Sequence, residues 1–335
     1  HHAVTEYPAG LPDQGHPYSG RTDRLQHGLG RTALARHETT DSRENFLGCG
    51  HRRGVLLEGF GIGRGRVSHA GQHTGRRVRT VYNSGMRAIQ VTTHGGPEVL
   101  SLTTVDDPTP ALGEVLVRTG AAGVNFIDTY LRRGMYPSVP PYIPGSEIAG
   151  TVVAAGPDVT GLGLGERVAT VNAVGGYAEL VAVPAERTVR LPDDVPDDIA
   201  GSSMLRGLTA HYLLDGSAHP REGDTVLVHA GAGGVGLILT QLAKLRGLRV
   251  ITTVSSDEKE SLSREAGADH VLRYGDDLAA EVRDLTAGEG VTVVYDGVGA
   301  DTFEQSLAST AVRGTVVLYG AASGPVPPFD LQRLN

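Results

Sequence analysis

The sequence predicts an α/β protein with two domains, a β-rich domain followed by a doubly wound parallel sheet. Two patterns support this prediction. Short strands separated by turns containing Gly and Pro dominate residues 86–195, whereas strands and helices alternate strictly beyond residue 220. A chain of 335 residues is also long enough to form two hydrophobic cores.

Residues 1–85 precede this pattern and show neither the strand period nor the helix period. We expect this extension to be disordered or foreign to the natural protein, with Met86 as the natural start. A transit peptide is one alternative, although such peptides are poor in acidic residues and this stretch is not. A metal-binding pair of Cys49 and His51 is another, but no matching second pair accompanies it.

The first domain is predicted over residues 86–207 and is expected to consist mainly of strands. The expected strands are residues 87–91, 99–102, 114–118, 148–154, 167–171 and 178–183. Alternating apolar residues between Gly and Pro turns favour strands at these places. A helix rich in small and apolar residues is expected over residues 197–214.

The second domain is predicted over residues 208–335. Its expected strands are residues 225–229, 249–254, 271–272, 291–295 and 315–319, and its expected helices are residues 235–246, 257–266, 277–285 and 301–307. Strands that alternate with helices of this length favour a parallel sheet with helices on both faces.

A glycine-rich loop follows the first strand of the second domain and opens an apolar helix. In this pattern Gly231 makes a tight turn, Gly233 lets the backbone approach a pyrophosphate, and Gly236 permits close packing of helix and strand. Gly234 and Val235 complete the loop, and the helix N-terminus stabilises the anion. Because strand, loop, helix and second strand follow in order, the sequence predicts binding of a nicotinamide dinucleotide.

The end of the second strand favours NADPH over NADH. An NAD enzyme normally carries an acid there, whereas NADP requires room and positive charge for its 2′-phosphate. Here Ser255 and Ser256 end the strand, and Lys259 lies one helical turn further on. Residues 255–258 also fit a helix capping box and Lys259 a solvated position, and both are compatible with phosphate binding. Asp257 leaves NAD open as an alternative.

Composition restricts the classes of partner. A net charge of −8 gives no electrostatic reason to expect nucleic-acid binding. Cys49 is the single cysteine, which excludes an intrachain disulfide and a cysteine-rich metal site. The chain contains neither an apolar run long enough to span a membrane nor an apolar signal core. We expect a soluble, cytoplasmic protein that acts on a small molecule, without a nucleic-acid or membrane partner.

Four segments occur in the order typical of one family: Gly-Val-Asn-Phe-Ile-Asp-Thr-Tyr at residues 123–130, Arg-Gly-Leu-Thr at 206–209, the region 223–244 around the glycine loop, and Val-Tyr-Asp-Gly-Val-Gly at 294–299. From Met86 onward the chain resembles the zeta-crystallin-like NADPH:quinone oxidoreductases of the medium-chain dehydrogenase/reductase superfamily. The resemblance implies a GroES-like β-barrel domain followed by a Rossmann domain, with the active site between them.

The resemblance also implies roles for individual residues. Asn125, Asp128 and Tyr130 would line the nicotinamide and quinone site, and Thr209 would lie near the nicotinamide. Arg206 stands where many relatives carry Lys, so the charge is kept while the donor geometry differs. From the residues alone, Asn125 could instead cap the following helix, Asp128 could lie on its solvated face, and Tyr130 could be a core aromatic. On the cofactor side, the resemblance implies that Lys259 and Tyr274 hold the 2′-phosphate.

Zinc alcohol dehydrogenases of the same superfamily carry a catalytic Cys and a Gly-His-Glu motif. The corresponding positions here read Asn-Phe-Ile-Asp at residues 125–128 and Gly-Ser-Glu at 145–147, and no Cys follows Met86. We therefore expect no metal site and favour hydride transfer to a quinone or conjugated enone, which carries its own electron sink. The proton donor stays open between Tyr130 and water.

Alternatives are an enoyl-thioester or alkenal reductase of the same fold, and a non-catalytic protein that binds NADPH or RNA. Relatives continue past the position of Asn335 into a sixth strand. We therefore expect this chain to be a C-terminally truncated form with an exposed apolar strand edge. The resemblance also implies that this last strand pairs two subunits, so we expect the intact protein to be a homodimer.

Overall fold

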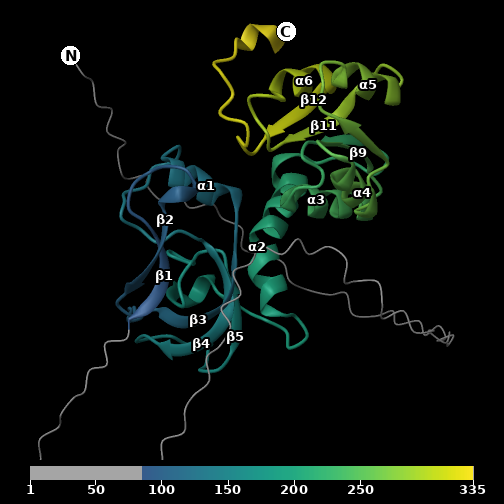
Figure 1. Cartoon of the computed structure of the whole chain (residues 1–335). Coiled ribbons are helices and arrows are strands. Elements are labelled where there is room, and N and C mark those ends of the chain that lie inside the picture. The colour runs from purple at the N-terminus through teal and green to yellow at the C-terminus, as the bar shows by residue number, and fades with distance from the viewer. Residues whose placement is uncertain (1–84, 335) are drawn as a thin grey trace, which may run out of the picture. The chain divides into compact units, whose positions relative to one another are not determined.

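The structure is a computed structural model, and it describes residues 85–334 (Figure 1). Antiparallel strands form the N-terminal part of this region, and parallel strands with helices form the C-terminal part. The predictions for residues 1–84, including those for Cys49 and His51, lie outside the described residues.

The first domain contains a five-stranded antiparallel sheet and a separate strand pair. The sheet has the order β6 (Leu180–Pro184), β3 (Glu114–Gly123), β4 (Glu147–Ala155), β5 (Arg167–Thr170) and β7 (Val189–Arg190). The pair consists of β1 (Met86–Val91) and β2 (Leu100–Val105). Isolated bridges at Ala88–Ala178 and Val91–Tyr142 join β1 to the rest of the domain.

Alternation of side chains in β3 explains its place in the core. Val115 and Val117 are buried in the hydrophobic cluster of this domain, while the next residue, Arg118, is exposed. The strand extends to Gly123, further than the predicted residue 118, because it pairs with β4 over its whole length through two register shifts. Immediately after β3, the chain turns into α1 (Phe126–Arg133), which ends at Gly134 in the left-handed conformation.

Helix α2 (Asp197–Tyr212) continues into a π-helical turn over Leu213–Ser217. It packs against β3 and β4 of the first domain and against α3 (Gly234–Leu245) of the second. A Cβ atom on Gly201 would lie 2.9 Å from the carbonyl oxygen of Ala121, so a glycine permits this close approach of helix and sheet. The predicted domain boundary after residue 207 falls within α2, and its position stays a prediction.

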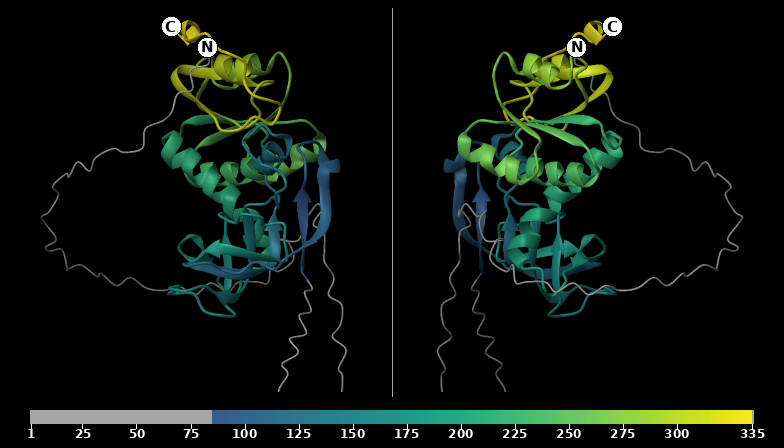
Figure 2. Two further views of the ribbon diagram at one scale, coloured as in Figure 1. Left: turned by 90° about the vertical axis from the view of Figure 1, so that its left-hand side faces the viewer. Right: turned by 90° about the vertical axis from the view of Figure 1, so that its right-hand side faces the viewer.

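The second domain contains five parallel strands, as the alternating pattern predicts. Their order is β10 (His270–Arg273), β9 (Arg249–Val254), β8 (Thr225–Val228), β11 (Val291–Asp296) and β12 (Thr310–Leu318). The helices besides α3 are α4 (Asp257–Glu265), α5 (Leu278–Leu285) and α6 (Phe303–Ser309). Figure 2 shows helices on both sides of this sheet.

Alternate residues of the central strand β8 enter two separate cores. Val226 and Val228 belong to the cluster that includes residues of α2 and α3, whereas Leu227 belongs to the cluster that includes Leu278 and Val282 of α5. Burial of a strand on both faces is typical of a doubly wound sheet, which confirms the predicted fold class.

The last strand differs most from its prediction. β12 begins at Thr310 rather than at residue 315, because Thr310 pairs with Val291 before the register shifts, with Arg313 at φ 67° in the intervening bend. In the described sheet β12 is an edge strand, and Val312 in it is 93% exposed.

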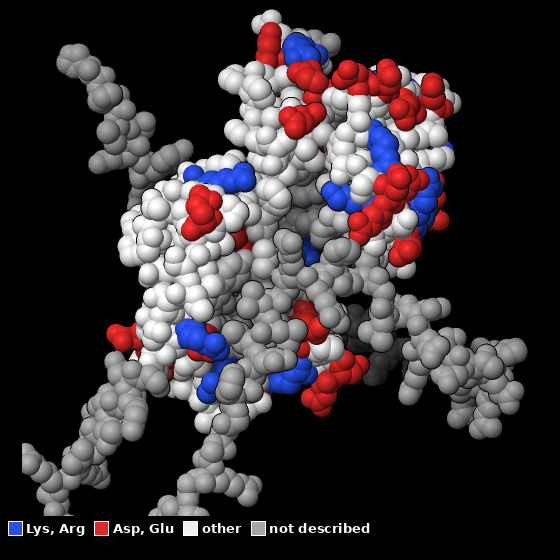
Figure 3. Space-filling view, viewed as in Figure 1, with Lys and Arg blue, Asp and Glu red and all other residues white. Residues whose placement is uncertain are grey.

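Several charged groups on the surface are paired with groups of opposite sign. On the face shown in Figure 3, basic side chains lie beside acidic ones. Arg87 and Glu179 form one such pair at 2.6 Å, and Arg333 and Glu304 another at 2.7 Å. Over residues 85–334, no helix is both long and apolar enough to cross a membrane.

Candidate cofactor and active site

The glycine loop connects the end of β8 to the start of α3 and leaves no room for a side chain at Gly231 or Gly236. A Cβ atom on Gly236 would collide with the carbonyl oxygen of Ala230, and one on Gly231 would collide with the side chain of Thr252. Gly233 is the N-cap of α3 and has no side chain to satisfy the first amides of the helix. This cradle fits the pyrophosphate of a dinucleotide, which the free amides of the helix N-terminus would bind.

A buried polar network holds the strand end beneath this loop. His229 is fully buried, with Nδ1 2.9 Å from Thr253 Oγ1 and Nε2 3.0 Å from Ser306 Oγ. Ser306 in turn donates to Asp296 Oδ2 at 2.7 Å. Burial lowers the pKa of His229, and the charge of Asp296 opposes this shift only in part. The imidazole is therefore neutral at neutral pH and links β9, through Thr253, to α6, through Ser306.

The predicted 2′-phosphate residues lie at two places near this loop. Lys259 Nζ donates to Ser255 Oγ at 2.9 Å, so the ammonium group stays at the end of β9. Tyr274 lies over the glycine loop, because its hydroxyl accepts a hydrogen bond from the amide of Ala230 at 2.9 Å and its ring stacks on His229. Lys259 therefore contacts the strand end, and Tyr274 contacts the loop.

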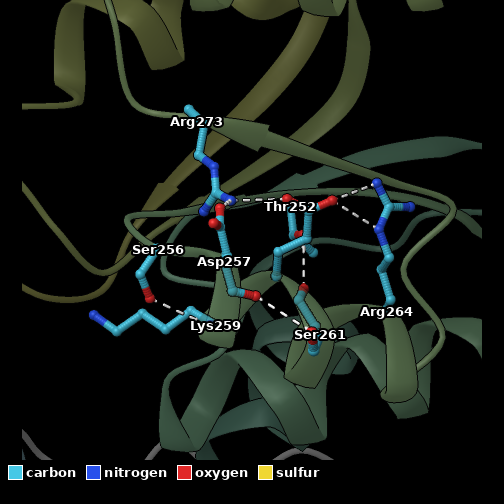
Figure 4. Close-up of polar contacts among 9 residues, drawn as sticks. Thr252, Ser256, Asp257, Lys259, Ser261, Arg264 and Arg273 are labelled. Atoms are coloured by element: carbon cyan, nitrogen blue, oxygen red, sulfur yellow. Dashed lines mark hydrogen bonds and ion pairs between the residues drawn. The ribbon is translucent and has the colours of Figure 1, made fainter.

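The predicted capping box at residues 255–258 is wrong by one position. Ser256 is the N-cap of α4, and its Oγ accepts the amide of Lys259 at 3.3 Å (Figure 4). The physical reason is that β9 runs through Val254 and leaves Ser255 outside the helix, which frees the Ser255 hydroxyl for Lys259. Sequence alone does not separate two adjacent serines for this role.

On the substrate side, Asn125 and Asp128 form the beginning of α1. Asn125 is the N-cap, and its backbone amide donates to Asp128 Oδ2 at 2.9 Å. Asn125 thus caps the helix, which was one of the alternatives considered from the sequence. Asp128 is 6% exposed, so the alternative that places it on the solvated face of α1 is wrong. Its carboxylate points into the domain because the capping interaction turns it back toward the helix start.

Asp128 has a second partner that the sequence did not indicate. The hydroxyl of Tyr177 donates to Asp128 Oδ2 at 2.7 Å, while Asp128 Oδ1 is buried without a partner among the described residues. Burial raises the pKa of Asp128, and the hydrogen bonds from Asn125 and Tyr177 act in the opposite direction. Burial and the neighbouring carboxylate also raise the pKa of Tyr177, so this phenol is neutral.

Glu147 is the second site residue that sequence reasoning passed over. It is fully buried at the start of β4, and its two oxygens accept from the side-chain amide of Asn125 at 2.7 Å and from the backbone amide of Leu205 at 2.8 Å. A carboxylate accepts hydrogen bonds, so Glu147 fixes the nitrogen of the Asn125 amide toward itself. Asn125 is therefore held through both its backbone and its side chain.

Tyr130 is buried between two aromatic rings, Phe126 and Tyr136, with ring centroids at 5.4 and 5.2 Å. Its hydroxyl accepts a hydrogen bond from the backbone amide of Ala321 at 2.9 Å. The hydroxyl proton is not used in that bond, and burial raises the pKa of the phenol. Tyr130 thus presents a neutral O–H group.

Arg206 and Thr209 occupy the same helix, α2, in different ways. Arg206 Nη2 donates to the carbonyl of Val124 at 3.1 Å, and its side chain lies against Gly234 of the cofactor loop. Arg206 therefore contacts both the segment before Asn125 and the glycine loop. The Thr209 hydroxyl donates to the carbonyl of Leu205 at 2.8 Å within the helix, which leaves its oxygen available as an acceptor.

Known proteins resemble this chain over the same regions. Residues 111–193 match the family model described as an alcohol dehydrogenase GroES-like domain, and residues 234–335 match the one described as a zinc-binding dehydrogenase. A quinone oxidoreductase of Pseudomonas aeruginosa is 46% identical over 254 residues, which cover 74% of this chain and 78% of the relative. The chain belongs to the quinone oxidoreductase family. The resemblance inferred from its four sequence segments is thereby confirmed.

Solved structures agree with this placement in the quinone oxidoreductase family. A mycobacterial protein solved in complex with NADPH is 57% identical, with a TM-score of 0.73 over 74% of this chain and 78% of that chain. The Escherichia coli quinone oxidoreductase, also solved with NADPH, is 39% identical, with a TM-score of 0.72 over 74% of this chain and 77% of that chain. The GroES-like and Rossmann-type architecture is thus confirmed.

One relative carries a different name. A 2-haloacrylate reductase of a Burkholderia species is 42% identical, and the match covers 70% of this chain and 73% of the reductase. In the present chain, hydrogen bonds join Asn125 to Asp128 and to Glu147. Over the part of the chain that the structure describes, no group of three or more His, Cys, Asp or Glu side chains is arranged to hold a metal ion.

Proposed function

We propose that the protein is an NADPH-dependent quinone oxidoreductase that transfers hydride to a quinone without zinc. The observation that carries this proposal is the tightly packed glycine cradle before α3, in a chain 46% identical to a quinone oxidoreductase. Bound NADPH supplies the hydride, and the protein supplies binding, orientation and hydrogen bonds. A quinone carries its own electron sink, so the step needs no metal to stabilise an alkoxide.

The cofactor would be held at both ends of the loop region. The pyrophosphate would lie against the segment formed by Gly231, Gly233, Gly234, Val235 and Gly236. The 2′-phosphate would be held by Ser255, Lys259 and Tyr274, and the contact of Lys259 Nζ with Ser255 Oγ already keeps a positive charge at the strand end. Two similar structures contain NADPH, which supports this choice of cofactor.

The acceptor would bind beside Asn125, Asp128, Tyr130, Arg206 and Thr209. Tyr130 is the strongest candidate for a group that contacts the acceptor oxygen, because its neutral O–H is not donated to the Ala321 amide. Such a donor stabilises the negative charge that develops on the oxygen when hydride arrives. Arg206 would support the same region through its contacts with Val124 and Gly234.

Reduction of a conjugated carbonyl compound is the second candidate function. The observation that favours it is the identity of 42% with a 2-haloacrylate reductase. A conjugated acid or enone resembles a quinone as an electron acceptor, since hydride adds to carbon and charge develops on oxygen. The same residues would serve both reactions, so which acceptor is reduced would depend on which acceptor shape fits beside these residues.

The natural protein is, in this proposal, a cytoplasmic homodimer. This follows from the resemblance, in which the strand after the position of Asn335 pairs two subunits; in the described sheet the edge of β12 is unpaired, with Val312 93% exposed, and has room for a further strand. The single cysteine, Cys49, excludes an intrachain disulfide and is compatible with a reducing compartment.

The test is oxidation of NADPH by the purified protein with a panel of quinones, conjugated acids and enals, followed through the loss of NADPH absorbance. We expect turnover with quinones, and we expect Tyr130→Phe to lower kcat at least about tenfold because a donor to the reacting oxygen is lost. Tight binding of NADPH without turnover of any acceptor would contradict the enzymatic proposal and favour a non-catalytic NADPH-binding protein.

A further inference from the structure

The structure shows how Asp257, the residue compatible with NAD as the cofactor, is held. Asp257 is the first acidic residue after β9 and begins α4 directly after its N-cap, Ser256. An acid at this end of the second strand is the group that binds the ribose 2′-hydroxyl in NAD enzymes. The Asp257 side chain is fully exposed, so nothing encloses it. Its orientation therefore depends on its partners.

Asp257 is paired with an arginine from the neighbouring strand. Arg273 is the last residue of β10, opposite Val254 of β9. Its Nη2 donates to Asp257 Oδ1 at 2.5 Å and to Glu260 Oε2 at 2.8 Å (Figure 4). One guanidinium nitrogen thus bridges two carboxylates that lie one turn apart on α4.

The other contacts of this cluster keep the arrangement specific. Arg264 donates to the second oxygen of Glu260, Oε1, through Nε at 2.9 Å and Nη2 at 2.7 Å. Arg273 Nη1 is buried without a hydrogen-bond partner among the described residues, so the hydrogen bonds of this guanidinium to Asp257 and Glu260 are made through Nη2. Two carboxylates are thereby matched by two guanidinium groups, and Asp257 is drawn toward β10.

Lys259 is engaged at a different place. Its Nζ lies 2.9 Å from Ser255 Oγ, whereas Arg273 engages Asp257 and Glu260. Lys259, at the strand end, and Asp257, which is paired with Arg273, therefore have different partners. An acid released from its arginine would be free to accept the ribose hydroxyls of NAD and would repel a 2′-phosphate.

We propose that Arg273 determines cofactor specificity by holding Asp257 away from the ribose, so that NADPH binds well and NADH poorly. This inference rests on the proposed function, in which Ser255 and Lys259 receive the 2′-phosphate. Arg273 acts through Asp257 and is a specificity-determining residue rather than a direct ligand of the phosphate. Release of Asp257 is therefore the effect that distinguishes this role from simple loss of a positive charge.

The experiment measures the Kd of NADP⁺ and NAD⁺ by calorimetry at low ionic strength. Arg273→Ala should tighten NAD⁺ binding about fivefold and weaken NADP⁺ binding by a similar factor, the size expected for an exposed ion pair. The gain for NAD⁺ should vanish in the double variant with Asp257→Ala, because the released acid is then missing. Asp257→Ala alone should leave NAD⁺ binding unchanged, since the wild-type acid is already held by Arg273.

Arg264→Ala is the matched control, because it removes an arginine of the same cluster that contacts Glu260 but does not contact Asp257. Its ratio of the two Kd values should equal that of the wild type. Arg273→Lys should keep most of the selectivity, since it can still pair with Asp257. A melting temperature for each variant shows whether it is folded, and Arg273→Gln, which keeps polar side-chain bulk, provides a second neutral variant if Arg273→Ala is unstable.

The outcomes separate this inference from the proposed function. A wild-type protein that binds neither nucleotide contradicts both. If the wild type prefers NADP⁺ but both neutral variants keep the ratio of Kd values within about twofold, Arg273 does not set specificity while the proposed function stands. A gain for NAD⁺ that persists without Asp257, or a loss of NADP⁺ affinity with no gain for NAD⁺, also overturns it.

Discussion

Single side chains in the candidate site act through partners that are distant in sequence. Asp128 receives hydrogen bonds from the Asn125 backbone and from Tyr177, and Asn125 is held in turn by Glu147. Both carboxylates are buried, so these few donors supply the hydrogen bonds that water would otherwise provide. The chemistry of α1 is therefore set as much by β4 and the Tyr177 segment as by α1 itself.

Tyr177→Phe should raise the pKa of Asp128. The phenol donates a hydrogen bond to the carboxylate and so stabilises its charged form; without it, burial acts with less opposition. If Asp128 takes part in turnover, the limb of the pH profile of kcat/KM that belongs to it should move to higher pH.

Tyr142→Phe is the control for this change. The Tyr142 hydroxyl is buried without a hydrogen-bond partner among the described residues, so its removal breaks no hydrogen bond in the same domain. We expect the wild-type pH profile in this variant. An identical profile in Tyr177→Phe would mean that Asp128 does not titrate in the reaction.

The sequence indicated which residues belong to the site more readily than how they are held. Asn125, Asp128 and Tyr130 were identified through the family resemblance carried by residues 123–130, and the structure places them together at α1. Tyr177 lies 49 residues from Asp128, and no local pattern marks such a contact. Arg273 was missed for the same reason, since it meets Asp257 only through the pairing of β9 and β10.

At the scale of elements, the glycine loop and α3 form one tightly fitted unit. The loop carries three of its own constraints: the amide of Gly231 bonds to the carbonyl of Thr253, the amide of Gly233 to that of Ala230, and Gly236 packs on Ala230. Replacing one of these glycines by a residue with a side chain would therefore distort the loop itself.

Gly236→Ala should weaken cofactor binding and destabilise the fold. The new Cβ would collide with the Ala230 carbonyl oxygen, and overpacking of this kind typically costs about 1–3 kcal/mol. We expect a lower denaturation midpoint together with a raised Kd for NADPH.

Gly207→Ala tests whether this effect is specific to the loop. Gly207 lies in α2, and no heavy atom outside the local helix backbone lies within 4 Å of the position that a Cβ would occupy. Alanine should therefore stabilise the helix by about 0.5–1 kcal/mol. Equal losses of NADPH affinity in both variants would argue against the tight loop as the cause.

The order of elements in the second domain followed from sequence because strands and helices alternate with strong apolar patterns. The first residue of an element was harder to predict. β12 starts at Thr310 because of a pairing with Val291 across a bend at Arg313, and a non-glycine residue with positive φ gives no signal in the sequence. Two neighbouring serines likewise hid the true N-cap of α4, Ser256.

For the whole molecule, the described sheet ends at β12. The strand carries exposed apolar groups, Val312 at 93% and Leu318 at 45%. An unprotected edge of this kind invites pairing with another chain. In the described sheet this edge is open to a further strand, either of the same chain or of a second copy.

Val312→Lys should weaken self-association. A charge on an exposed strand edge discourages pairing with another strand. Sedimentation at several protein concentrations should show a dimer for the wild type and a larger share of monomer for the variant. Leu245→Lys is a suitable control, because Leu245 is also exposed, at 83%, but lies at the end of α3. A wild-type protein that stays monomeric at every concentration would contradict the dimer.

The buried contacts of His229 have a consequence for the thermodynamics of ligand association. The imidazole bonds to Thr253 and Ser306, and the neighbouring amide of Ala230 bonds to Tyr274, so the loop is ordered before a nucleotide arrives. Ordering a free backbone costs about 1–2 kcal/mol per residue in conformational entropy. Because folding has already ordered this loop, nucleotide binding does not incur this entropic cost again.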